Sequence, residues 1–206
     1  MSTQQVLLAE AGGGPGWTSW NPSDVQKITL SNNNLTAVTT GATNPVGVRA
    51  VSGASTGKRY WEVTMTAWVG NGTGIGLATL AAVLFGGAVA GQAVVTKAIT
   101  SFGGIQINGT YSGVALGSVT DGGIVGIAVD LTAGLIWFKY LGSNWNNSGT
   151  ANPATGVGGI SLGALSGTIL FPFLGAASSG VTATANFGAS AFIGAVPAGF
   201  TSGWPA

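Results

Sequence analysis

Short stretches in which apolar and polar residues alternate recur along the chain, and breaks rich in glycine or asparagine separate them. The clearest stretch is residues 59–65, where Trp61, Val63 and Met65 occupy every second position. The residues between them, which include Glu62, fall on the opposite face. This alternation predicts a half-buried strand whose core face carries Trp61.

The longest strand signal is residues 121–140, in which two apolar runs flank a polar break that ends in glycine. In residues 123–131, bulky valine, isoleucine and leucine residues share one face, and Gly126 and Ala128 lie on the other. Residues 135–140 predict the antiparallel return strand. We therefore expect a β-hairpin whose bulky face packs on a second sheet and whose small-residue face allows close approach.

Turn signals divide the rest of the chain into further short strands. These strands are predicted at residues 27–30, 34–39, 169–174 and 181–187. Pro172 favours an edge position or a bulge for its strand. The dipeptides Asn71-Gly72 and Asn108-Gly109 favour tight hairpin turns, and residues 144–159 form a long polar loop. Together these elements predict one all-β domain, an antiparallel β-sandwich.

Composition supports this fold class and narrows the chemistry. The chain has 206 residues, of which 37 are glycine and 5% are charged, against a usual charged share of about 25%. Such a glycine content disfavours long helices. The chain has no cysteine and no histidine, which removes thiolate chemistry, disulfides and the commonest general base and metal ligand. We expect no metal and no cofactor.

Charge excludes one class of partner. The six basic and five acidic residues give a net charge of +1 and are scattered along the chain. Because no basic cluster is present to neutralise phosphates, we expect no binding of nucleic acid.

The beginning of the chain differs from the rest. Residues 11–16, Ala-Gly-Gly-Gly-Pro-Gly, form a flexible hinge that separates a short N-terminal arm from the sandwich of residues 17–206. The arm is either a frayed terminus or a docking peptide, and its apolar residues Val6, Leu7 and Leu8 are candidate assembly contacts. Their run is too short for the hydrophobic core of a signal peptide, so we expect synthesis without a Sec export signal.

One apolar region is long enough to suggest a membrane span. Residues 70–96 carry no charge, but they contain polar residues and several glycines. We therefore favour buried strands over a transmembrane helix and expect no membrane insertion. Residues 81–104 are expected to pack in the core or in a subunit contact, with Val83, Leu84 and Phe85 as candidate contact residues.

The carboxylates argue against hydrolysis of glycosides. They are Glu10, Asp24, Glu62, Asp121 and Asp130. Asp121 and Asp130 are nine positions apart, or roughly 30 Å along one strand, whereas glycoside cleavage needs a pair within about 5–10 Å. We assign no catalytic residue and expect a protein that is not an enzyme.

Aromatic and amide side chains provide the remaining binding chemistry. Trp61 and Trp137 lie on predicted strands and are expected in the core, whereas Trp145 lies in the polar loop. An exposed tryptophan among amides can stack on a sugar ring. The favoured alternative is that it anchors its loop on the sandwich, because large aromatic side chains are mostly well buried. Our candidate ligand-binding residues are Asn144, Trp145, Asn146 and Tyr111.

Four segments in order resemble the SPRY domain, a sandwich related to the concanavalin-like jelly roll. Gly-Lys-Arg-Tyr-Trp-Glu-Val at 57–63 resembles the opening strand of the family, and Gly-Ile-Gly-Leu-Ala-Thr at 74–79 resembles its Gly-Ile-Ala-Thr strand. The hairpin at 121–140 resembles the core hairpin, although Asp121 stands slightly early. Asn-Phe-Gly at 186–188, with the aromatic residues that follow, resembles the closing strand.

Residues 20–24 and 28–32 resemble the version of this domain found in bacteriophage tail and virion-surface proteins. The resemblance implies a non-enzymatic structural protein on a phage particle, as a capsid decoration, head fibre or tail-fibre module. Its partners would be other virion proteins and identical copies of the chain, and its location the virion surface. The alternative is an adhesin module that binds a glycan or protein of the host surface.

Overall fold

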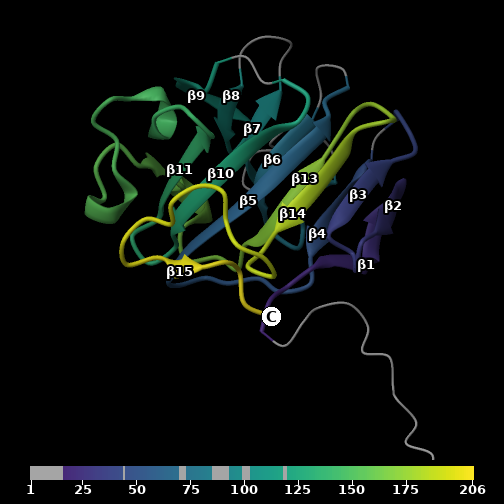
Figure 1. The fold of residues 1–206 in the computed structure, drawn as a ribbon, viewed down its shortest axis with the longest axis horizontal. Coiled ribbons are helices and arrows are strands. Elements are labelled where there is room, and N and C mark those ends of the chain that lie inside the picture. The colour runs from purple at the N-terminus through teal and green to yellow at the C-terminus, as the bar shows by residue number, and fades with distance from the viewer. Residues whose placement is uncertain (1–15, 44, 70–72, 85–92, 99–102, 118–119) are drawn as a thin grey trace, which may run out of the picture.

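A computed structural model describes residues 16–43, 45–69, 73–84, 103–117 and 120–206, and the backbone of 93–98. The chain forms two antiparallel sheets packed face to face (Figure 1). The first sheet has the order β1 (Trp20–Gln26), β4 (Gly47–Ala50), β13 (Phe171–Gly175), β6 (Thr73–Ala78), β7 (Ala93–Ala98), β8 (Gly104–Ile107) and β9 (Thr110–Ala115).

The second sheet carries the candidate site. Its order is β12 (Ile160–Ser161), β11 (Leu135–Tyr140), β10 (Gly123–Asp130), β5 (Lys58–Ala67), β14 (Thr182–Asn186), β3 (Thr36–Thr39) and β2 (Ile28–Ser31). An eighth strand, β15 (Thr201–Ser202), runs parallel to the start of β5. Three single-turn 3₁₀ helices complete the described elements: η1 (Trp145–Asn147), η2 (Pro153–Thr155) and η3 (Gly163–Leu165). The expected β-sandwich is therefore confirmed.

The main core lies between the sheets. Trp61, Val63 and Met65 of β5 are fully buried in it, and so are the bulky residues of β10. The hairpin of β10 and β11 is confirmed, with Asp130 paired to Leu135 across its turn. Strand alternation therefore placed the core residues on the correct face.

Turn chemistry is also confirmed where the structure describes it. Asn108 and Gly109 have φ values of 52° and 80° and join β8 to β9, as a type I′ turn requires. The turn from β2 to β3 contains three asparagines, Asn32, Asn33 and Asn34, all at positive φ. Asn71-Gly72 lies outside the described residues.

Pro172 does not lie in an edge strand, so that expectation was wrong. Strand β13 lies between β4 and β6 in the interior of its sheet, and Pro172 pairs with Leu77 of β6. Pairing of β13 with β4 begins only at Phe173, one residue after the proline. The missing N–H is tolerated because β4 is not yet paired at that position.

Strand β5 is not half-buried, which corrects a second expectation. Tyr60 and Glu62 point away from the core, yet they are 0% and 3% exposed. The C-terminal segment crosses the lower part of the outer face of the second sheet and covers them (Figure 1). Phe200 of this segment forms a second apolar cluster with Tyr60, Ala128 and Trp137.

The apolar region that precedes β7 is described only in part. Ala82 and Leu84 are buried against Ala78 and Phe173 on the outside of the first sheet, whereas Val83 is 50% exposed. Phe85 and the arm residues Val6, Leu7 and Leu8 lie outside the described residues. Among the described residues, no helix is long and apolar enough to cross a membrane.

Candidate functional site

The candidate site lies on the outer face of the second sheet, where strand register aligns side chains in rows. Glu62 of β5 pairs with Asn186 of β14 on one side and with Gly126 of β10 on the other. Gly126 pairs in turn with Lys139 of β11. Because Gly126 has no side chain, the Tyr60 ring and its hydroxyl occupy the space above it. A carboxylate, an amide and an ammonium group therefore share one row of this face.

Glu62 is held by neutral donors. Its Oε1 accepts hydrogen bonds from the Tyr60 hydroxyl at 2.6 Å and from the Gly194 N–H at 2.6 Å, and its Oε2 accepts one from the Ile193 N–H at 3.0 Å. Burial raises the pKa of Tyr60 well above its usual range, and the hydrogen bond to Glu62 and the charge of Glu62 raise it further. Tyr60 is therefore a permanent hydrogen-bond donor at neutral pH.

Lys139 lies at the other end of the row and points toward Trp145. Its Nζ lies 4.6 Å from the centroid of the Trp145 ring, a cation–π contact. Burial lowers the pKa of Lys139, and the charge of Glu62 opposes this effect. The ring of Trp145 also meets the ring of Tyr60 edge to face, with centroids 6.2 Å apart.

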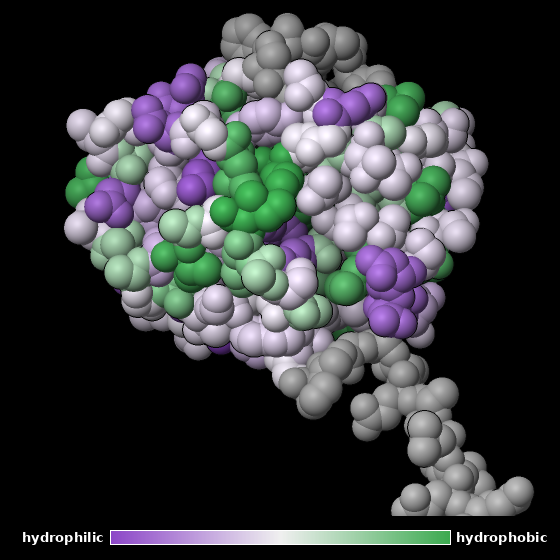
Figure 2. Space-filling model, viewed as in Figure 1, coloured by the Kyte–Doolittle hydropathy of each residue, from purple (hydrophilic) through white to green (hydrophobic). Residues whose placement is uncertain are grey.

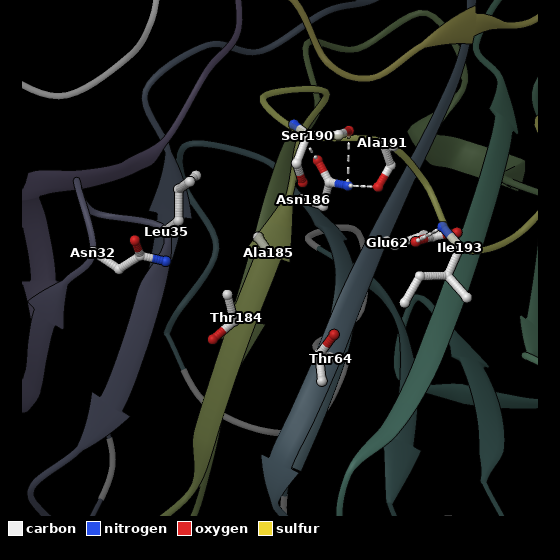
Figure 3. Close-up of a pocket in the computed structure, with 10 residues that line it drawn as sticks. All are labelled: Asn32, Leu35, Glu62, Thr64, Thr184, Ala185, Asn186, Ser190, Ala191 and Ile193. Atoms are coloured by element: carbon white, nitrogen blue, oxygen red, sulfur yellow. Dashed lines mark hydrogen bonds between the residues drawn. The ribbon is translucent and has the colours of Figure 1, made fainter.

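A pocket of about 190 Å³ opens beside Glu62 (Figure 3). It lies between the β2–β3 turn and the segment that follows β14. Its lining residues are Asn32, Leu35, Glu62, Thr64, Thr184, Ala185, Asn186, Ser190, Ala191 and Ile193. Glu62 is the only charged residue among them.

Asn186 builds one wall of the pocket. Its Nδ2 donates to the carbonyl oxygens of Ser190 and Ala191, and its Oδ1 accepts from the backbone N–H groups of Gly188 and Ser190. These bonds fold the chain back toward β5, so that Ile193 reaches Glu62. Asn186 therefore shapes the pocket but has no remaining donor for a ligand.

The surface around the pocket has little charge. Thr36, Thr184 and Thr64 form a row across β3, β14 and β5, and the hydroxyls of Thr36 and Thr184 are 2.8 Å apart. Figure 2 shows a broad pale area over β14 and β3, beside an apolar patch near the middle of this face. Ile193, at the pocket, is 74% exposed.

The structure places the predicted ligand-binding residues apart from this pocket. Trp145 is half-buried and packs on Tyr60 and Lys139, as a loop anchor would. Asn146 is 6% exposed, and its side chain bonds the backbone of Phe138 and Gly158. Asn144 is exposed beside them. Tyr111 of β9 is 49% exposed and belongs to the other sheet, so the four residues do not form one site.

Each of the four described carboxylates takes part in an ion pair or a hydrogen bond within the fold. Asp24 pairs with Arg49 at 2.6 Å, and Asp130 pairs with Lys58 at 3.2 Å. Asp121 accepts a hydrogen bond from the Trp68 N–H and lies at the opposite end of β10 from Asp130. Glu10 lies outside the described residues. No group of three potential metal ligands occurs among the residues that the structure describes.

Sequence reasoning missed the pocket, because its walls come from segments far apart in the chain. It placed Glu62 on a solvent face, and it did not select Asn186 or Ile193. One signal was available: Glu62 is the only charged residue between Arg59 and Lys97. A lone carboxylate in such an apolar region is typically paired or hydrogen-bonded inside the protein.

Comparison with solved structures identifies the fold. The sequence matches no protein-family model and no curated protein. Among solved structures, the chain is similar to the SPRY domain of human HERC1, with a TM-score of 0.61 and 16% identity over 81% of this chain and 96% of that one. It is equally similar to the TRIM65 PSpry domain, with a TM-score of 0.61 and 16% identity over 82% and 91%. The chain is therefore an antiparallel two-sheet sandwich, and its fold is SPRY-like.

Proposed function

We propose that the chain is a non-enzymatic binding module that recognises a protein partner with the outer face of its second sheet. The observation that carries this proposal is the pocket beside Glu62, which opens next to the exposed Ile193 on a face with little charge. An apolar patch rimmed by polar residues, such as the one that Figure 2 shows on this face, is typical of an interaction site. The structural hydrogen bonds and ion pairs of the described carboxylates support a role without catalysis.

The size of the pocket favours a protein partner. Its volume of about 190 Å³ is below the roughly 300–1,000 Å³ of pockets that enclose small molecules. A pocket of this size accepts one side chain, with the flat threonine-rich surface around it in contact with the rest of the partner. A single sugar ring is the alternative occupant.

The finer proposal is a structural role on the surface of a bacteriophage particle, with other virion proteins as partners. It rests on the resemblance of residues 20–24 and 28–32 to virion-surface domains and on the low charge of the chain. Immunogold electron microscopy of particles purified from a producing culture tests it. Label at a regular position on the particle is the expected result, and unlabelled particles would contradict it.

A reconstitution experiment tests the binding face. Particles that lack the chain are mixed with purified fluorescent chain, and the bound fraction is measured. Ile193→Lys replaces the exposed apolar side chain at the pocket with a cation and is expected to weaken binding at least tenfold. Ile169→Lys is the matched control, because Ile169 is 58% exposed and precedes β13 of the other sheet. Equal binding by both variants would place the interface elsewhere.

A glycan array distinguishes the adhesin alternative. If a glycan of the host surface were the ligand, the wild-type chain would bind a defined set of sugars, and Trp145→Ala would abolish that binding. On the proposal favoured here, no glycan binds at a concentration at which the chain binds particles. Binding of sugars by the wild-type chain that Ile193→Lys removes would instead make the pocket a sugar site.

A further inference from the structure

We propose that the pocket beside Glu62 receives a cationic side chain, arginine or lysine, of the partner protein, with Glu62 as its counter-charge. This inference rests on the proposed function, because it names the chemistry that the binding face recognises. It follows from the charge balance around Glu62, from the acceptors that remain in the pocket and from the apolar part of its wall.

Glu62 makes no contact ion pair with a cation among the residues that the structure describes. Glu62 is 3% exposed, and its three hydrogen-bond donors, one hydroxyl and two backbone N–H groups, are all neutral. The ion pairs among the described residues join Asp24 to Arg49 and Asp130 to Lys58. Buried carboxylates are usually paired with a cation, so a cation that enters the pocket gains an interaction that the free protein lacks.

Lys139 is electrostatically coupled to Glu62, but the two groups form no contact ion pair. It lies two strands from Glu62 in the row that passes through Gly126, which corresponds to roughly 10 Å between the strands. Its Nζ is held over the ring of Trp145. In the described part of the chain no cation directly contacts the Glu62 carboxylate, so a cationic group of a partner can make that contact.

The pocket also has acceptors for the donors of a cationic group. A carboxylate offers about four lone-pair sites, and Oε2 of Glu62 uses one of its two for the Ile193 N–H. Thr64 lies two positions beyond Glu62 on the same face of β5, and its hydroxyl makes no hydrogen bond within the described part of the chain. The side chain of Asn32 lines the opposite side of the pocket (Figure 3).

The rest of the wall suits the stem of such a side chain. Leu35, Ala191 and Ile193 line the pocket with apolar groups. Arginine and lysine bury their methylene groups along apolar surface while their charged ends meet polar groups. An anion would face the Glu62 carboxylate without a compensating cation, so an acidic side chain is excluded from this pocket.

Titration of the full chain with small probes tests the inference. The probes are Nα-acetyl-arginine N-methylamide and Nα-acetyl-lysine N-methylamide, with the corresponding citrulline and Nε-acetyl-lysine compounds as uncharged controls. Two-dimensional NMR follows the backbone amides of Ile193 and Gly194, which donate to Glu62. Saturable shifts with a charged probe, at least tenfold tighter than with its uncharged control, are expected. Equal binding of charged and uncharged probes would overturn the inference, and so would the absence of any shift.

Two variants of β5 localise the effect. Thr64→Lys places a cation on the same face as Glu62, roughly 7 Å along the strand, and is expected to weaken binding of the charged probe at least tenfold. Thr66→Lys adds the same charge on the same face, roughly 13 Å from Glu62, and is expected to change binding less than twofold. Thr66 is exposed and outside the pocket lining, whereas Thr64 is half-buried in it, so the two variants place the same charge outside and inside the pocket. Unchanged probe binding by Thr64→Lys would contradict the proposed pocket.

Glu62→Gln provides a direct removal of the charge. It sets an amide NH₂ against the backbone N–H groups that now face a carboxylate, so its folding must be checked by circular dichroism. Thr64→Lys keeps the test decisive if the glutamine variant does not fold. If the probes fail but Ile193→Lys still blocks particle binding, the cation inference falls and the binding module stands. If the probes bind but Ile193→Lys has no effect on particle binding, the proposed function falls.

Discussion

The Tyr60 hydroxyl is expected to contribute strongly to stability, and Tyr60→Phe tests this contribution. The change removes the donor of the 2.6 Å hydrogen bond to Glu62 and leaves the ring and its aromatic neighbours in place. A buried hydrogen bond to a charged group is worth about 1.5–3 kcal/mol. Oε1 of Glu62 keeps the Gly194 N–H, so the loss stays below the roughly 3–5 kcal/mol of a buried charge that loses its partner.

Urea denaturation followed by tryptophan fluorescence measures this loss. We expect a lower midpoint with an unchanged m-value, and a melting temperature lower by about 3–12 °C at roughly 2–4 °C per kcal/mol. Tyr111→Phe is the matched control, because Tyr111 is 49% exposed, and it is expected to change stability by less than about 0.5 kcal/mol. A Tyr60→Phe variant as stable as the wild type would refute the reasoning.

The same variant has a predicted pH signature. The folded protein raises the pKa of Tyr60 above its unfolded value of about 10. Above that pH the unfolded chain releases the phenol proton while the folded chain retains it, so wild-type stability falls as pH rises. Tyr60→Phe removes this contribution. Between pH 10 and 12 the stability of the variant is expected to fall less steeply than that of the wild type. The two slopes are expected to differ by about 1.4 kcal/mol per pH unit. Parallel pH profiles of the two proteins would contradict the assignment.

Two further substitutions test the backbone and the loop. Gly203→Ala places a methyl group 2.2 Å from the carbonyl oxygen of Phe187 at a φ of 104°, so we expect a loss of at least about 1–3 kcal/mol in urea denaturation. Gly149→Ala, with open space around it, should be nearly neutral. Asn146→Ala removes hydrogen bonds that hold the loop and is expected to cost about 1–3 kcal/mol and to speed proteolysis within residues 144–159. Asn147→Ala, exposed and at a similar positive φ, controls for backbone strain, and equal losses in both asparagine variants would refute a role for these bonds.

Local patterns in the sequence were sufficient for much of the fold. The alternation at Trp61, Val63 and Met65 selected the core face of β5, and Asn108-Gly109 located a hairpin turn. These signals succeed because side-chain direction in a strand and backbone shape in a tight turn depend on a few neighbouring residues. The SPRY resemblance succeeded for the same reason, since its motifs are strands and turns.

The site could not be predicted in this way. The alternating pattern of its strand predicts that Glu62 faces solvent. In the structure Glu62 accepts a hydrogen bond from the N–H of Ile193, 131 positions later. The loop around Trp145 has the composition of a sugar-binding loop, but the Trp145 ring lies against Tyr60 of β5 and Lys139 of β11. No periodic pattern in the sequence predicts either contact, because both depend on how the tertiary fold brings separate elements together.

The sequence by itself determined that the chain is an all-β sandwich, which residues form its main core and which turns join neighbouring strands, because these features follow from alternation and from residues that adopt positive φ. The tertiary structure alone decided that Pro172 lies inside a sheet, that β15 runs beside the start of β5, and that Glu62 is buried beside a pocket. Each of these depends on where the C-terminal segment and the strand order bring distant residues together, and burial of a charge is decided by those neighbours.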